Sequence, residues 1–288
     1  MSGPFRFLAF RRVWVAALLP AVFGASFFSA IRWYEFAVTF HPDPYTPGQE
    51  WKLPKGGEEV SFLNADRLRL HGWFISSQPQ PSRATVIFFH GNGGNISNVG
   101  WLGEYLAGRG FDVLLFDYRG YGKSEGRIKG ERDLYSDADA AYDYVVSKRG
   151  VSPERLVLYG HSLGTTAVVD LASRRPCSAI IVESGLSSAD EMASSMLPWL
   201  PRWMHGLGEN RFESAKKLIS VHSPVLIMHG DPDSVVPTEQ GIALFAAANE
   251  PKRLIIAEGA GHIVSGFDGF KYIDAVAEFI QESLRVAN

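Results

Sequence analysis

The residues best suited to chemistry centre on a serine between two glycines. Residues 160–164 read Gly-His-Ser-Leu-Gly, the pattern G-x-S-x-G, with an apolar run before it and a helical pattern of small residues after it. A sharp strand-to-helix turn needs residues without bulky side chains around a strained serine, which Gly160 and Gly164 provide. A plain glycine-rich turn is the alternative, since the pentapeptide alone is common. The context predicts Ser162 as a nucleophile.

A serine hydroxyl becomes nucleophilic when a neighbouring base takes its proton, and that base needs an orienting acid. Of the eight histidines, only His262 lies in a glycine-bearing loop after the last predicted strand. An ordinary surface-loop histidine is the alternative. For the acid, the loop HGDPDSVVP offers Asp231 and Asp233. We predict Asp233, which lies beyond the strand end, whereas Asp231 suits local turn hydrogen bonds.

The charge that develops on a reacting carbonyl oxygen needs backbone N–H donors. Residues 90–95 (HGNGGN) follow a predicted strand, and their glycines let the backbone approach a substrate. We predict the N–H groups of Asn92 and Leu163 as the two donors. A turn without a catalytic part is the alternative, and a phosphate-binding loop is disfavoured because its Lys-Ser/Thr ending is missing. The charged stretch 117–124 (DYRGYGKS) is interpreted as structural.

The elements around these motifs predict an α/β fold. Continuous apolar runs, typical of strands buried on both faces of a parallel sheet, alternate with helical patterns. Such alternation implies a mainly parallel sheet with helices on both faces. The predicted strands are a pair within 58–77 and the runs 84–89, 113–116, 156–159, 179–182, 224–228 and 253–256; the predicted helices are 134–146, 163–172, 238–248 and 272–284.

Together these motifs resemble the α/β-hydrolase superfamily. More narrowly, the chain is similar to the membrane-anchored branch that contains the mammalian α/β-hydrolase domain-containing proteins of the depalmitoylase-like type and their bacterial and fungal relatives. The resemblance rests on FFHGNGGN, DYRGYGKSEG, YGHSLG, VESGLSSADEMA, MHGDPDSVVP and GAGHI, in family order from about residue 58 to the C-terminus. The palmitoyl-removing members carry an N-terminal cysteine cluster, which this chain lacks.

The resemblance implies an eight-stranded, mainly parallel sheet flanked by helices, with a short cap insertion, and it implies no metal and no cofactor. By the same resemblance, the site residues are Ser162 as nucleophile, Asp233 as orienting acid, His262 as base, and Asn92 and Leu163 as oxyanion donors.

The N-terminal part contains a candidate membrane anchor. Residues 13–31 carry no charged side chain and, as a helix, would span about 28 Å, close to the ~30 Å hydrocarbon core. A cleaved signal peptide and a soluble core helix are the alternatives. More arginines precede the run than follow it, which predicts a cytoplasmic N-terminus and a catalytic domain on the far side of a single-pass membrane protein. The predicted division is 1–12 cytoplasmic, 13–31 anchor, 32–57 linker and 58–288 hydrolase domain.

A segment at 186–217 interrupts the strand–helix rhythm and is predicted to be a cap or lid. Its apolar residues are expected to bind an acyl chain, and closing the core over the sheet is the alternative. The leading hypothesis is a serine hydrolase of apolar carboxylic esters or thioesters, with a small molecule, a lipid or an acylated protein as substrate. A serine peptidase and a non-catalytic binding protein are the alternatives. The candidate lid residues are Met196, Trp199, Leu200 and Trp203.

Composition narrows the remaining classes. The 288 residues carry a formal net charge of −3, so nucleic acid is not an expected partner. The single cysteine, Cys177, permits neither an intrachain disulfide nor a cysteine zinc site. An oligomeric state does not follow from these features.

Overall fold

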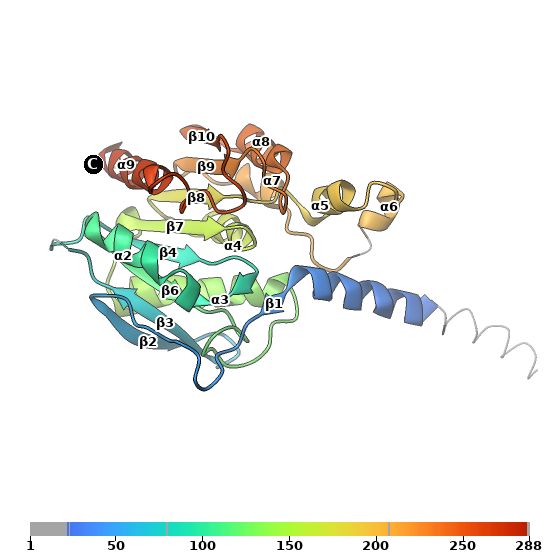
Figure 1. Cartoon of the computed structure of the whole chain (residues 1–288), viewed down its shortest axis with the longest axis horizontal. Helices are drawn as coiled ribbons and strands as arrows, with labels where there is room; N and C mark the ends of the chain where they lie inside the picture. The colour runs from blue at the N-terminus through green and yellow to red at the C-terminus, as the bar shows by residue number, and fades with distance from the viewer. Residues whose placement is uncertain (1–21, 23, 79, 207, 287–288) are drawn as a thin grey trace, which may run out of the picture.

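The computed structural model describes residues 22, 24–78, 80–206 and 208–286, and a single large sheet forms its centre (Figure 1). The strands of this sheet are β2 (Gly57–Leu63), β3 (Arg69–Ile75), β4 (Ala84–Phe89), β6 (Phe111–Phe116), β7 (Leu156–His161), β8 (Ala179–Glu183), β9 (Val225–Gly230) and β10 (Lys252–Ala257). Their order is β10-β9-β8-β7-β4-β6-β3-β2, and every pair is parallel except those that involve β3. The predicted mainly parallel, eight-stranded α/β sheet is confirmed.

The apolar runs of the sequence account for the middle of this sheet. All six residues of β4 are buried because helices cover both of its faces. The strand pair predicted within 58–77 is formed by β2 and β3, which are joined by a turn that begins at Asn64. The Asn64 side-chain oxygen accepts the backbone N–H groups of Asp66 and Leu68, each at 3.0 Å, which closes the turn.

Helices cover both faces of the sheet. Apolar residues of α2 and α9 pack on one face, and those of α3, α4 and α8 pack on the other. The helices are α2 (Gly100–Gly108), α3 (Glu131–Asp143), α4 (Gly164–Ala172), α5 (Ala189–Met196), α6 (Arg202–His205), α7 (Ser214–Leu218), α8 (Thr238–Ala247) and α9 (Lys271–Val286), with single turns η1 (Ile96–Asn98), η2 (Tyr144–Lys148) and η3 (Pro153–Arg155).

The chain before the sheet begins with a helix. Residues 24–39 are helical, so the first part of the predicted linker 32–57 continues the N-terminal helix. Aromatic packing holds the end of this helix against the body. The ring centroids of Phe36 and the buried Phe40 lie 5.7 Å apart, and those of Phe40 and Phe212 lie 6.3 Å apart. A two-stranded parallel sheet follows, formed by β1 (His41–Pro42) and β5 (Gly93–Gly94).

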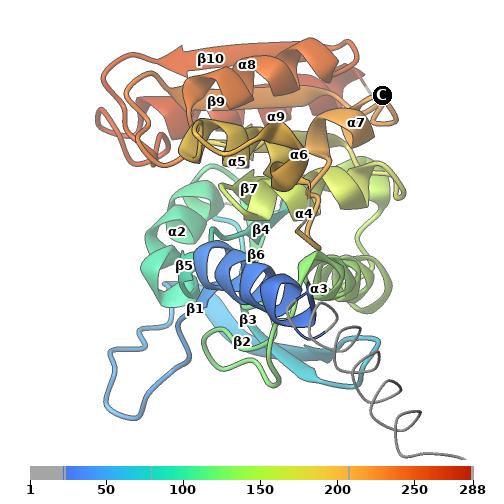
Figure 2. The ribbon, with the colours of Figure 1, turned by 90° about the vertical axis from the view of Figure 1, so that its right-hand side faces the viewer.

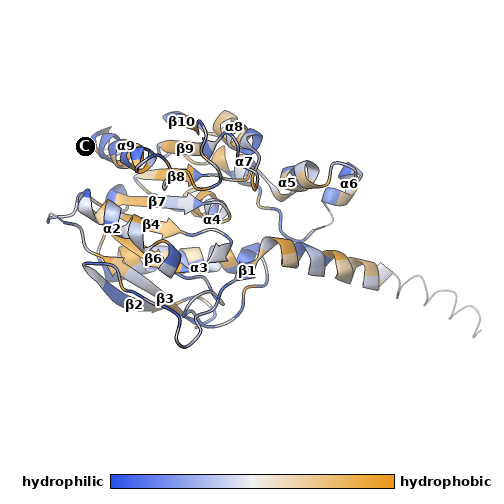
Figure 3. Cartoon of the chain, viewed as in Figure 1, coloured by the Kyte–Doolittle hydropathy of each residue, from blue (hydrophilic) through white to orange (hydrophobic). Residues whose placement is uncertain are grey.

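The proposed anchor at 13–31 lies partly outside the described residues, since 13–21 and 23 are not among them. Among the residues that are described, no helix is long and apolar enough to cross a membrane. Figure 3 shows apolar residues along the visible part of the N-terminal helix as well as in the strands.

The predicted cap segment contains α5 and α6, which project from the body. Figure 1 and Figure 2 show this pair on the same side of the molecule as the N-terminal helix. The pair is joined by a hydrogen bond between Ser194 Oγ and His205 Nδ1 at 2.9 Å and by the ion pair of Arg202 with Glu191 at 2.9 Å.

The carboxyl ends of parallel strands meet at one edge of a sheet, which is where such folds bind ligands. Here the loops after β4, β7, β9 and β10 carry Asn92, Ser162, Asp233 and His262, respectively. The topology therefore brings the predicted site residues to the same edge.

Candidate active site

Ser162 lies on a sharp turn between β7 and α4. Its φ of 52° is in the left-handed region, which a residue with a side chain adopts only under strain. A Cβ added at Gly160 would lie 2.7 Å from Thr165 Cα, and one added at Gly164 would lie 2.0 Å from the Phe89 carbonyl oxygen. Both glycines of the motif are therefore required by close backbone approach. The turn leaves Ser162 at the mouth of the site.

Asp233 and His262 form a hydrogen-bonded pair beside this serine. His262 Nδ1 donates to Asp233 Oδ2 at 2.8 Å, which leaves Nε2 free to face a partner. The other carboxylate oxygen accepts the backbone N–H groups of Val235 at 2.8 Å and Val236 at 3.0 Å. These bonds fix the carboxylate at the orientation that holds the imidazole.

The charge on Asp233 is stabilised by its surroundings. Burial raises the pKa of Asp233, but hydrogen bonds from His229, His262 and two backbone N–H groups outweigh it and hold the pKa well below its ordinary value. His229 Nε2 lies 3.3 Å from Asp233 Oδ2 and donates to the Val236 carbonyl at 2.8 Å. Asp233 is therefore ionised at neutral pH, as an orienting acid must be.

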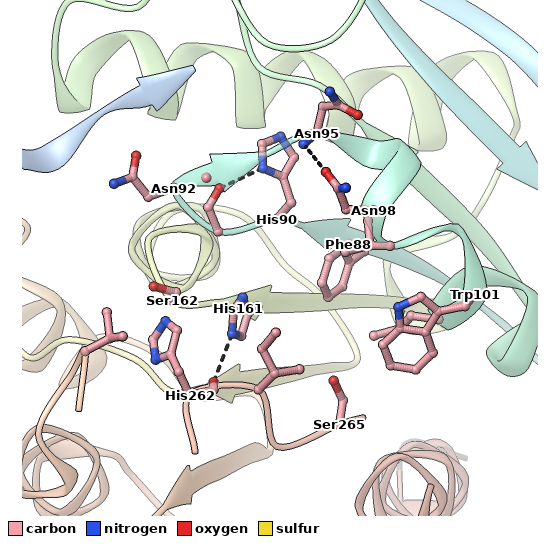
Figure 4. A pocket seen from close by; sticks show the side chains of 16 residues that line it. Phe88, His90, Asn92, Asn95, Asn98, Trp101, His161, Ser162, His262 and Ser265 are labelled. Atoms are coloured by element: carbon pink, nitrogen blue, oxygen red, sulfur yellow. Dashed lines mark hydrogen bonds between the residues drawn. The ribbon is translucent and has the colours of Figure 1, made fainter. Parts of the chain in front are cut away.

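Figure 4 shows the Ser162 side chain next to the His262 ring. Although both residues belong to the described part of the chain, no hydrogen bond joins them in this conformation. Such bonds are often long in ligand-free enzymes and tighten when substrate binds. The structure thus brings the three predicted triad residues together, with the acid–base contact formed.

The two predicted oxyanion donors lie on the two loops that flank Ser162. Leu163 follows the serine at the start of α4, and Asn92 lies in the loop after β4. Among the hydrogen bonds of the described residues, none has the backbone N–H of either residue as its donor. A Cβ at Gly91 would lie 3.4 Å from Ser162 Cβ, so this loop passes directly over the nucleophile. Two N–H groups are therefore available to a ligand beside Ser162.

A cavity of about 370 Å³ opens from Ser162 and His262 toward the start of α2. Figure 4 shows Ser162 and His262 at one end of it and Trp101 at the other. Its wall contains neither an aspartate nor a glutamate among the described residues. The apolar lining residues are Phe88, Val99, Trp101, Leu102, Val235 and Ile263.

Comparison with known proteins places this geometry in a family. An uncharacterized protein of Mycobacterium tuberculosis is 37% identical over 238 residues, which cover 82% of this chain and 83% of that protein. Alpha/beta hydrolase domain-containing protein 17C of Mus musculus is 34% identical over 232 residues, which cover 78% of this chain and 68% of that protein. The chain belongs to the α/β-hydrolase superfamily.

Two further comparisons agree with this membership. The family model described as "Serine aminopeptidase, S33" matches residues 80–216 of this α/β hydrolase. The structure of the Pyrococcus furiosus esterase Pf2001 superposes with a TM-score of 0.68 at 21% identity, and the match covers 85% of this chain and 99% of that one. At that identity the superposition shows a shared fold.

The loop after β10 that carries His262, here called the base loop, is held by His161, Glu183 and Ser184. These three contacts were not predicted from the sequence. The His262 carbonyl accepts Ser184 Oγ at 2.8 Å and His161 Nε2 at 3.1 Å. The Glu183 carboxylate accepts the backbone N–H of Ser265 at 2.7 Å, and the Glu183 carbonyl accepts that of Ser162 at 2.9 Å. Glu183 thereby ties the nucleophile and the base loop to one strand end. A buried glutamate that ends the apolar run AIIVE was the available signal.

Burial also sets the protonation of two histidines in the cavity wall. It lowers the pKa of His161, and it lowers the pKa of His90 to about 4. Both rings are therefore neutral at pH 7. The neutral His161 ring donates from Nε2 to the His262 carbonyl, so it orients the loop without adding a positive charge beside His262.

The predicted lid residues lie outside this cavity. Met196, Trp199 and Trp203 are 60%, 76% and 71% exposed, and Leu200 is partly exposed. They line neither the cavity nor the core, because α5 and α6 pack on each other and extend away from the sheet (Figure 1). Within the described residues, no group of three or more histidine, cysteine or acidic side chains is placed to hold a metal ion.

Proposed function

We propose that this α/β hydrolase cleaves carboxylic esters or thioesters of apolar acyl groups through an acyl-enzyme on Ser162. The observation that carries the proposal is the Asp233–His262 hydrogen bond placed beside a serine in a strained turn. A histidine with its Nδ1–H held by an ionised carboxylate presents Nε2 as a base. The cavity beside the serine gives an acyl substrate a place to bind.

The proposed reaction has two stages. Ser162 Oγ bonds to the acyl carbon as its proton passes to His262 Nε2, and the carbonyl oxygen becomes an oxyanion. The N–H groups of Asn92 and Leu163 stabilise that charge, each by roughly 3 kcal/mol. Collapse breaks the bond to the leaving oxygen or sulfur, which takes the proton from His262. Water then attacks the acyl-enzyme and gives a proton to His262. His262 passes this proton to Ser162 Oγ as the acyl–oxygen bond breaks and the carboxylic acid leaves.

The size and polarity of the cavity support an acyl group of short to medium length. Its 370 Å³ lies at the lower end of the roughly 300–1,000 Å³ typical of small-molecule sites. Trp101 lies at the end far from Ser162, and it lines the cavity together with Phe88 and Leu102, which favours an apolar group. The acyl chain is therefore proposed to extend from Ser162 toward α2.

A peptidase is the second candidate, because the matching family model is described as a serine aminopeptidase. The free ammonium of an aminopeptidase substrate needs an acidic partner when it is taken out of water. No acidic residue lines the described cavity, so an uncharged ester or thioester fits better. Hydrolysis of amino-acid anilides with kcat/KM above that of every ester would reverse this order.

The first test is hydrolysis of p-nitrophenyl esters from acetyl to palmitoyl by the wild type and by Ser162→Ala. The proposal expects turnover by the wild type with an optimum at short or medium chains, and a loss of about 10⁶-fold in the variant. Unchanged activity in Ser162→Ala would refute the role of this serine. An inert wild type on all esters and thioesters would favour the peptidase or a binding protein.

We also propose that residues 13–31 anchor the enzyme in a membrane, with the catalytic domain on the side opposite a cytoplasmic N-terminus. The support is the uncharged run and the arginines before it. Protease treatment of intact spheroplasts should cut the catalytic domain from outside. Protection there, together with cleavage from the cytoplasmic side, would reverse the orientation.

A further inference from the structure

The loop that carries the proposed oxyanion donor is bound by a segment from the N-terminal side of the chain. Strand β1 pairs in parallel with β5, so that His41 is opposite Gly93 and Pro42 is opposite Gly94. The His41 backbone N–H donates to Asn92 Oδ1 at 2.7 Å. Asn92 Nδ2 donates to His41 Nδ1, also at 2.7 Å. Both ends of the Asn92 amide are therefore held by one residue more than fifty positions earlier.

The next residues of the segment continue this attachment. The Asn95 side-chain amide donates to the carbonyl and to the carboxylate of Asp43, each at 3.1 Å. The Asp43 carbonyl also accepts the Gly122 N–H at 3.0 Å, and the Gly122 carbonyl accepts the Tyr45 N–H at 2.8 Å. Residues 41–45, here called the strap, thus lie between residues 90–95, here called the oxyanion loop, and the loop after β6.

The N-terminal helix that leads into the strap is fixed to residues 209–212, in the predicted cap segment. The Glu35 carboxylate accepts the backbone N–H groups of Glu209 at 2.8 Å and Asn210 at 2.7 Å, and the Asn210 side chain at 2.9 Å. Phe40, which precedes the strap, is buried against Phe212. Figure 1 shows the helix ending beside β1 at the edge that carries the site. The strap therefore connects the end of the N-terminal helix directly to the active-site edge.

The oxyanion loop needs such support because of its composition. Gly91, Gly93 and Gly94 surround Asn92, and glycine allows many backbone conformations. A donor stabilises an oxyanion well only when its direction is set before the reaction. The two hydrogen bonds with His41, together with a longer one that Tyr121 Oη donates to Asn92 Oδ1 at 3.4 Å, hold the Asn92 side chain, and this orients its backbone N–H.

We propose that His41 is a positioning residue of this hydrolase, and that the strap couples the N-terminal helix to the oxyanion hole. The inference rests on the proposed function, because Asn92 acts there as an oxyanion donor. His41 itself does not touch the substrate. It acts through Asn92, on the transition state more than on substrate binding.

The test compares three variants of the full-length protein in detergent. His41→Ala removes the acceptor of Asn92 Nδ2, whereas His41→Asn can offer an oxygen at the position of Nδ1. His222→Ala, at an exposed histidine, is the matched control. His41→Ala should lower kcat about tenfold, less than the ~10²–10³-fold loss for removal of a donor itself, with KM nearly unchanged. His41→Asn should restore most of kcat, and His222→Ala should match the wild type.

A second measurement does not depend on activity. Hydrogen–deuterium exchange of the peptide that covers residues 90–98 should become about fivefold faster in His41→Ala, since one hydrogen bond is lost there. Exchange around Ser162 and His262 should stay unchanged.

Unchanged exchange and unchanged kcat in His41→Ala would overturn the inference while leaving the proposed function intact. A parallel rise in KM, or faster exchange throughout the sheet, would show a general structural role and would also overturn it. If the wild type is inert on every substrate, the proposed function fails, and the exchange result alone decides whether the strap orders the loop.

Discussion

Asp231 and Asp233 lie two positions apart in one loop, yet they have different partners. Asp233 Oδ2 accepts His262 Nδ1, whereas Asp231 Oδ1 accepts the Gly259 N–H at 2.7 Å. We predict that Asp233→Asn lowers kcat for esters by about 10⁴-fold, because the amide stabilises the wrong histidine tautomer. Asp231→Asn keeps an oxygen for Gly259 and should stay within about threefold of the wild type. Steady-state kinetics on one p-nitrophenyl ester measures both.

The same pair of variants tests the sequence-based choice between the two aspartates. If Asp231→Asn loses more activity than Asp233→Asn, the acid has been misassigned. Melting temperatures of both variants serve as the control, because a loss of fold would lower activity in either case.

Asp117 is a buried carboxylate behind the oxyanion loop. Burial raises the pKa of Asp117 to about 7. Oδ1 accepts the Ile96 N–H at 2.9 Å, and the backbone N–H and the ammonium of Lys123 also lower the pKa of Asp117, but burial outweighs these contacts. His90 Nε2 lies 3.7 Å from Oδ1 and His71 Nδ1 lies 4.0 Å from Oδ2, but burial lowers the pKa of each histidine. Neither ring therefore compensates the carboxylate charge near neutral pH.

This raised pKa predicts a pH-dependent stability. A carboxyl group with a folded-state pKa near 7 and an ordinary value of 3.8 contributes stability below about pH 4, and this contribution is lost as the pH rises through 7. The free energy of unfolding should fall by up to about 4 kcal/mol over this pH range, at 1.36 kcal/mol for each pKa unit. Asp117→Asn cannot ionise, so it should not show this fall. Chemical denaturation from pH 4 to 8.5 measures it. Asp268→Asn, at an exposed carboxylate, is the control, and equal pH slopes in Asp117→Asn and wild type would contradict the prediction.

At the residue scale, local motifs carried most of the predictable information. The glycines around Ser162 signal the turn because the backbone approach that requires them is a local event. His161 and Glu183 were not predicted, because their contacts with the loop that carries His262 join residues 101 and 82 positions apart, respectively. Spacing in a single sequence contains no record of such pairs.

Among the elements, long apolar strands were predictable and short ones were not. β4 and β7 are buried on both faces, so their sequences are continuously apolar. β1 and β5 have two residues each and exist only because the strap meets the oxyanion loop. The extension of the N-terminal helix from residue 31 to residue 39 was likewise not predicted, because its end is set by tertiary contacts such as that of Phe40 with Phe212.

The start of α2, rather than the cap, forms the far wall of the cavity, which predicts where chain-length preference is set. Trp101→Ala should enlarge the apolar end and shift the optimum of kcat/KM toward longer esters by several carbons. Trp199→Ala, which removes an exposed cap tryptophan of the same size, should leave the optimum unchanged. A series of p-nitrophenyl esters measures both. If the preferred ester length shifts in Trp199→Ala but not in Trp101→Ala, the acyl chain binds at the cap instead.

On the scale of the whole molecule, the cap and the N-terminal helix extend from the same side (Figure 1). Met196, Trp199 and Trp203 expose apolar surface there, and Trp33 is 72% exposed on the helix. Tryptophan favours the interface between a bilayer and water, where its ring is shielded and its N–H stays hydrated. With the chain anchored through residues 13–31, this side would face the membrane.

This arrangement predicts that the cap tryptophans touch lipid. In vesicles with bromine near the headgroup end of the acyl chains, the intrinsic fluorescence of the full-length protein should be quenched, and part of that quenching should disappear in Trp199→Phe with Trp203→Phe. Trp73→Phe, at a fully buried tryptophan, should leave the quenched component unchanged. The double variant should also keep its kcat on a soluble ester, since neither residue lines the cavity. If the quenched component is the same in the double variant and the wild type, the cap stays in water, and a substrate from the bilayer would have to reach Ser162 by another route.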